Sequence, residues 1–171
     1  MAMASSATAT VTLPADTQIL IRREFDAPKE LVYRAWTTPE LIERWWSGDR
    51  GTVTLAEVDL RVGGSWRYVM VANEGFEVAF HGEFREIVPN ERIVSTEVYE
   101  APASEGDAYP PGDEQAALNT VTFAEDAGRT ILTLLVDCPS KKIRDAIVGS
   151  GMEVGLQEAW SKLEQVARSL G

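Results

Sequence analysis

The chain has 171 residues, of which 16 are Lys or Arg and 27 are Asp or Glu, so its formal net charge at neutral pH is −11. This length fits one domain, and the negative charge argues against binding to nucleic acid or to an anionic membrane surface, because both depend on Lys and Arg. Cys138 is the only cysteine of the sequence and His81 the only histidine. The chain therefore has no intramolecular disulfide and no cysteine-cluster zinc site. We expect neither a metal nor a cofactor.

Residues 1–16 are small and polar, with no basic residue and no long apolar run. They do not resemble a secretory signal peptide, and we expect them to form a flexible leader before a single domain over residues 17–171. Elsewhere no apolar segment approaches the ~20 residues that a membrane-spanning helix needs. These observations predict a cytoplasmic protein.

The first part of the domain predicts one strand and two short helices. Residues 18–25 place apolar side chains at a spacing of two, which is typical of a strand. Pro28 favours the start of a helix that ends near Trp36. Thr38 can cap a second helix, which ends at Trp45–Trp46.

Alternating patterns separated by turn residues then predict a run of strands. Within the first of them, the apolar residues switch from odd-numbered to even-numbered positions. This switch predicts a bulge near Ala56–Glu57. Residues 101–115 are rich in Pro, Gly and acidic side chains and are predicted to form a mobile loop, either solvated or gating a cavity. The strands are predicted over residues 52–60, 65–71, 76–84, 92–100, 118–124 and 130–136.

Ser140 can cap a long C-terminal helix that continues to about Leu170, with apolar residues mostly three or four apart. Gly149, Gly151 and Gly155 interrupt it, so either the helix kinks or small residues leave room beside it; we favour room for a ligand. An antiparallel sheet with one apolar face needs a cover, and only this helix is long enough. The expected fold is α+β: a curved antiparallel sheet of about six or seven strands around the C-terminal helix, with two short helices closing one end and a cavity between sheet and helix.

Four segments of the chain form an ordered pattern: FDAPKELVYRAWTTPELIERWW at 25–46, DLRVGGSWRYVM at 59–70, GEFREIVPNERIV at 82–94 and GMEVGLQEAWSKLEQV at 151–166. They resemble the activator of heat-shock protein 90 ATPase family, C-terminal-domain type, within the START-like (SRPBCC) group of birch-pollen-allergen, polyketide-cyclase and lipid-transfer relatives. The resemblance implies the helix-grip fold and a small-molecule-binding role. The co-chaperones of this family carry an additional N-terminal domain, which residues 1–16 are too short to supply.

The candidate ligand site is an aromatic wall facing the C-terminal helix. Trp66, Tyr68 and Met70 share one face of a strand, a pattern that fits core packing and also fits a small-molecule site, where aromatic walls carry a few polar tips. The expected ligand is a hydrophobic or amphipathic small molecule. The candidate ligand-binding residues are Trp46, Trp66, Tyr68, Met70, Phe80, Val121, Phe123, Met152, Leu156 and Trp160.

Two alternatives stay open. A cyclase- or aromatase-type enzyme would need a buried acid/base pair, for which His81, Glu83 and Tyr68 are the candidates, although alternation along the strand places His81 and Glu83 on the solvent side. A chaperone-interaction module would use the surface instead, with a chaperone as its partner. Separately, the chain could form a homodimer. We assign no catalytic residue, and nothing near Cys138 in the sequence would activate its thiol.

Overall fold

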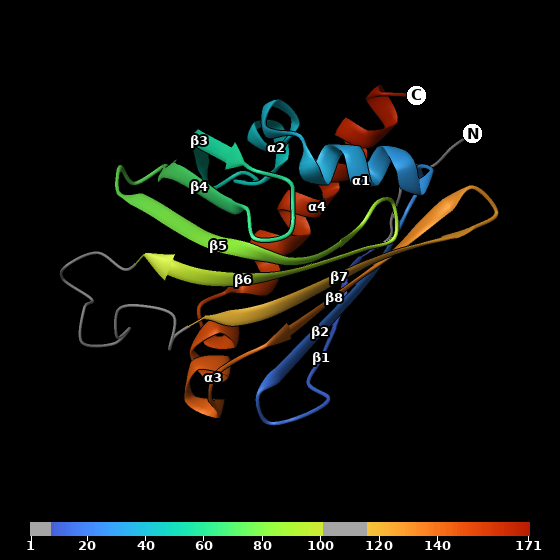
Figure 1. Ribbon diagram of the computed structural model, residues 1–171. Coiled ribbons are helices and arrows are strands. Elements are labelled where there is room, and N and C mark those ends of the chain that lie inside the picture. The colour runs from blue at the N-terminus through green and yellow to red at the C-terminus, as the bar shows by residue number, and fades with distance from the viewer. Residues whose placement is uncertain (1–7, 101–115) are drawn as a thin grey trace.

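One curved antiparallel sheet organises the fold, with its strands in the order β1-β2-β8-β7-β6-β5-β4-β3 (Figure 1). The computed structural model describes residues 8–100 and 116–171, so residues 1–7 and the loop expected at 101–115 lie outside the described residues. The strands are β1 (Thr10–Thr12), β2 (Gln18–Phe25), β3 (Gly51–Val58), β4 (Ser65–Ala72), β5 (Glu77–Val88), β6 (Arg92–Glu100), β7 (Ala117–Asp126) and β8 (Arg129–Asp137).

The helices are α1 (Lys29–Thr37), α2 (Pro39–Trp45), α3 (Lys141–Gly149) and α4 (Met152–Ser169). Helix α4 runs across one side of the sheet, and α1 and α2 contact it near one end (Figure 1). Ser140 caps α3, because its Oγ accepts the backbone N–H of Ile143 at 3.2 Å. The predicted α+β arrangement, a curved antiparallel sheet around a C-terminal helix, is therefore confirmed.

The core lies between β2 and α4. Alternation along β2 turns Ile19, Ile21 and Phe25 toward the helix, and all three are fully buried. The Phe25 ring lies 5.8 Å from the ring of Trp160 on α4. Because each such side chain contributes about 1.5–3 kcal/mol when buried, this contact holds α4 on the sheet.

A buried ion pair adds a polar link between the same two elements. Arg23 shares the buried face of β2, and its Nη2 lies 3.5 Å from Oε1 of Glu164 on α4. The other carboxylate oxygen of Glu164 accepts the backbone N–H of Asp26 at 2.8 Å. The Arg23 guanidinium also lies over the Phe25 ring, 4.6 Å from its centroid. Glu164 therefore joins α4 both to the side chains and to the backbone at the end of β2.

Strand β1 is an eighth strand that the sequence analysis assigned to a flexible leader. Its three residues pair antiparallel with residues 20–22 of β2. Just before it, the backbone N–H and C=O of Ala9 both bond to the Gln157 side chain on α4, each at 2.9 Å. The expectation of a leader without a strand is wrong for Thr10–Thr12, because distant partners order these residues and a three-residue strand carries no readable pattern of its own.

The bulge in β3 and the C-terminal helix also differ from expectation. The register shifts between Val53 and Leu55, not at Ala56–Glu57, because Leu55 is apolar but does not share the face of the later apolar residues. The predicted continuous helix breaks at Gly151, whose φ of +83° separates α3 from α4. Glycine adopts a left-handed backbone conformation at little cost. Of the two alternatives for the glycine run, a kink or room for a ligand, the structure therefore contains an interruption of the helix.

Candidate functional site

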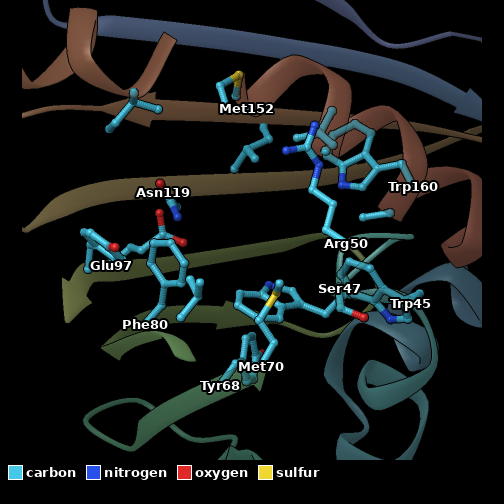
Figure 2. A pocket seen from close by; sticks show the side chains of 18 of the residues that line it. Trp45, Ser47, Arg50, Tyr68, Met70, Phe80, Glu97, Asn119, Met152 and Trp160 are labelled. Atoms are coloured by element: carbon cyan, nitrogen blue, oxygen red, sulfur yellow. The ribbon is translucent and has the colours of Figure 1, made fainter. Parts of the chain in front are cut away.

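A cavity of about 950 Å³ lies between the sheet and α4. Strands β4 to β8 form its floor, and α2, α3 and the start of α4 form its other walls (Figure 2). Its volume is near the upper end of the range for small-molecule pockets, about 300–1,000 Å³. Most of its lining side chains are apolar or aromatic, so its interior favours a ligand with a large apolar surface.

Nearly all of the candidate ligand-binding residues line this cavity. The exception is Phe123, which lies beyond it in the core and packs edge-on against Tyr33 of α1 at 5.4 Å. Phe123 shares the inward face of β7 with Val121, but at its position α1 covers the strand and leaves no open space. The residues that line the cavity as expected are Trp46, Trp66, Tyr68, Met70, Phe80, Val121, Met152, Leu156 and Trp160.

Four aromatic side chains form a continuous wall at the β4–β5 side of the cavity. The Trp46 ring meets those of Tyr68 and Phe80 edge-on, at 5.4 and 5.7 Å between centroids. Trp66 packs against Tyr68 at 4.7 Å, and its Nε1 donates to the backbone oxygen of Thr96 at 3.2 Å. Such edge-to-face contacts restrict ring motion, so the wall is largely preformed.

A polar cluster that the sequence analysis missed lies on the neighbouring strands. Glu97 of β6 and Asn119 of β7 both line the cavity, and their side chains hydrogen-bond to each other (Figure 2). Burial raises the pKa of the Glu97 carboxyl, an effect that the bond from Asn119 partly opposes. Burial also raises the pKa of the Tyr68 hydroxyl, and the charge of Glu97 adds to this shift. A carboxyl group within an apolar cavity is thus biased toward its neutral form.

One sequence signal would have located Glu97. Ile93 and Ser95 alternate with it along β6, and all three line the cavity. The alternation is the same one that identified the other strands, but a charged residue within it is ordinarily assigned to solvent. Only the cavity, which is a feature of the folded chain, makes an inward carboxyl possible here.

The residues expected to form an acid/base pair are not brought together. His81 lies on the outer face of the sheet, where its Nδ1 is 2.9 Å from Oε2 of Glu100. Arg67 donates to both oxygens of the same carboxylate at 2.9 Å. Tyr68 faces the cavity on the opposite side, and Glu83 is an exposed partner of Arg85. The candidate set of His81, Glu83 and Tyr68 is therefore wrong as a catalytic constellation.

Glu100 takes its electrostatic character from this outer cluster. The hydrogen bonds from Arg67, and secondarily the bond with His81, lower the pKa of the Glu100 carboxyl to about 2. By contrast, burial raises the pKa of the Cys138 thiol to about 11, which makes it unreactive at neutral pH. Within residues 8–100 and 116–171 no group of three or more His, Cys, Asp or Glu is arranged to hold a metal ion.

The cavity reaches the surface between the β4–β5 turn and the junction of α3 with α4. Phe76 on the turn is 55% exposed and also lines the cavity. Arg50 extends from the loop after α2 toward α4, with its Nε 3.6 Å from Oε1 of Glu158 (Figure 2). A Cβ at Gly155 would lie 3.4 Å from Nε of Arg50. The space beside Gly155, expected to serve a ligand, is therefore occupied by an arginine of the chain itself.

Comparison with known proteins gives a consistent picture. A family model described as "Activator of Hsp90 ATPase homolog 1-like protein" matches residues 26–168. No curated protein matches the chain in sequence. Among the described residues, no helix is both long and apolar enough to cross a bilayer.

Solved structures of bacterial proteins share the fold. A protein from Rhodobacter sphaeroides has a TM-score of 0.82 at 24% identity, covering 95% of this chain and 99% of its own. Protein CV1439 from Chromobacterium violaceum has a TM-score of 0.74 at 27% identity, covering 90% and 98%. An AHSA1-like protein from Aeromonas hydrophila has a TM-score of 0.64 at 22% identity, covering 89% and 94%.

Proposed function

The chain belongs to the activator of Hsp90 ATPase homolog 1-like family, and from this premise we propose that it is a small-molecule-binding protein. Its ligand is a hydrophobic or amphipathic molecule held between the sheet and α4. The observation that carries the proposal is the cavity of about 950 Å³ with a preformed aromatic wall. A void of this size is costly in a protein interior, where close packing is the rule.

The apolar walls set the scale of the affinity. A ligand that buries roughly 300 Å² of apolar surface gains about 7–8 kcal/mol from the transfer out of water. Part of that gain is offset by the lost freedom of the two molecules. Hydrophobic burial alone therefore supports binding no tighter than roughly micromolar, and tighter binding requires polar contacts within the cavity.

Native mass spectrometry of freshly purified, detergent-free protein tests the proposal. We expect a reproducible extra mass that is lost on denaturation and recovered by organic extraction. Leu156→Trp places an indole in the cavity and should remove that mass. Leu118→Trp is the matched control, because Leu118 is 40% exposed and does not line the cavity. Circular dichroism establishes that both variants are folded.

Two results would contradict the proposal. One is an extra mass that Leu156→Trp leaves unchanged, which would put the ligand elsewhere. The other is a bare wild-type protein that no lipophile stabilises in a thermal-shift screen. That second result would favour the chaperone-interaction module, which acts through its surface and needs no open cavity.

A further inference from the structure

We propose that Glu97 and Asn119 form a polar subsite that receives the head group of the ligand. The head group donates hydrogen bonds and carries no negative charge, as in an amine or a hydroxyl. This inference rests on the proposed ligand-binding function and specifies the chemistry of one end of the ligand. Three observations support it. Asn119 has an unpaired acceptor atom, acidic side chains predominate among the charges of the cavity, and the sheet does not need this pair in order to fold.

Asn119 supplies the first observation. Its side chain is only 8% exposed and lines the cavity. Its amide group hydrogen-bonds to Glu97, while its Oδ1 is buried with no hydrogen-bond partner among the described residues. Buried polar atoms are nearly always paired, and an unpaired one costs free energy. A ligand that donates an N–H or O–H to Oδ1 removes this cost.

The charges around the cavity exclude an anionic head group. Asp49, Glu74, Glu97 and Glu158 are the acidic residues in its described lining, and Arg50 is the one basic residue. Arg50 lies at the α4 side, beside Glu158. A carboxylate or phosphate next to the pair would meet the unpaired Oδ1 acceptor of Asn119, and wherever Glu97 is ionised it would also meet a like charge, with no cation there to balance it.

Folding alone does not account for the pair. Strands β6 and β7 are already joined by a continuous antiparallel register in which Ser95 pairs with Asn119 and Glu97 with Ala117. The Glu97–Asn119 bond lies outside this ladder and requires a carboxyl group to be held inside an apolar cavity. Apolar side chains at both positions would satisfy the sheet equally well. Retention of a polar pair inside an apolar cavity points to a ligand contact.

Three probes with the same ten-carbon chain test the inference: decylamine, 1-decanol and decanoate, each kept below its micelle concentration or solubility limit. Calorimetry or quenching of tryptophan fluorescence measures their binding to the full chain. We expect the amine or the alcohol to bind at least about tenfold more tightly than decanoate, the size of effect that one unpaired or repelled polar group produces. Tighter binding of the amine than of the alcohol would identify a cationic head group. Equal binding of the two would show that an uncharged hydrogen-bond donor, such as a hydroxyl, is enough.

Variants assign the preference to the subsite. Glu97→Leu combined with Asn119→Leu replaces both partners by apolar groups of similar size, a change that leaves no orphaned polar atom and should preserve folding. It should reduce the preference over decanoate to less than about threefold. Glu100→Gln is the control for charge, because Glu100 is on the same strand but faces outward toward Arg67 and His81. It should retain the wild-type preference.

The outcomes separate this inference from the proposed function. If all three probes bind the wild type with equal affinity, the cavity binds ligands and the subsite is wrong. If the double variant keeps the full preference, the head group is recognised elsewhere. If none of the probes binds, the ligand-binding function fails and the subsite fails with it.

Discussion

Trp66 and Gly82 are direct partners in the pairing of β4 with β5, and the indole of Trp66 lies over the bare Cα of Gly82. A Cβ at position 82 would come within 2.6 Å of Nε1 of Trp66 and would also meet the backbone oxygen of Thr96. That oxygen is the acceptor of the indole N–H. The missing side chain of Gly82 therefore allows the aromatic wall to be anchored to β6.

We expect Gly82→Ala to destabilise the protein and disturb this wall. The added methyl group must displace the backbone of Thr96 as well as the indole, and overpacking of this kind typically costs about 1–3 kcal/mol. Urea denaturation followed by tryptophan fluorescence measures both effects. Gly149→Ala is the control, because a Cβ there has no atom within 4 Å and lies in a helix. Equal stabilities of the two variants would contradict the steric role.

Glu164→Ala should be among the most destabilising single substitutions in the chain. It removes the buried carboxylate that contacts Arg23 and the acceptor of the Asp26 N–H. Breaking a buried pair from one side typically costs about 3–5 kcal/mol, because the remaining charge stays buried. The free energy of unfolding in guanidinium chloride measures the loss. A loss below about 1 kcal/mol, the range of exposed pairs, would show that Glu164 does not carry this link.

Glu97 makes stability depend on pH in an unusual direction. Because burial raises its pKa in the folded state, folding favours the protonated form. The contribution is fully present below the unfolded-state pKa and is lost as the pH rises through the higher folded-state pKa. Glu97→Gln stays neutral at every pH, so it should be more stable than the wild type at about pH 8 and nearly equal to it at about pH 4. A difference that does not change with pH would contradict the buried, proton-retaining carboxyl.

Glu100 should have the opposite effect on the outer face. Its pKa falls from an ordinary value of 4.5 to about 2 in the folded state, mainly through the hydrogen bonds from Arg67. The stability it contributes is present above pH 4.5 and is lost as the pH falls toward 2. Glu100→Gln should therefore lower the melting temperature near neutral pH and have a vanishing effect at the acid end. The control is Glu83→Gln, since the Glu83–Arg85 pair is exposed and contributes little.

The sequence predicted the architecture because each strand carries its own alternation and each turn its own residues. It predicted most of the cavity wall for the same reason. Trp66, Tyr68 and Met70 are two residues apart and so lie on one face of their strand, whatever the distant contacts are. It missed Glu97 on β6 and misplaced Phe123 on β7, because inward-facing positions of neighbouring strands differ in what lies above them. Glu97 faces the open cavity, whereas α1 packs over the strand at Phe123. This difference exists only once the helices have packed on the sheet.

Strand β1 gives the sheet a safeguard against joining with other chains. Without it, the eight-residue strand β2 would present its free backbone N–H and C=O groups as a long template for a strand of another molecule. The three residues of β1 cover the middle of that edge, and the bonds of Ala9 to Gln157 hold the segment in place. Among the described residues, the outermost strand on this side is then a short one, which offers few free backbone groups to a strand of another molecule.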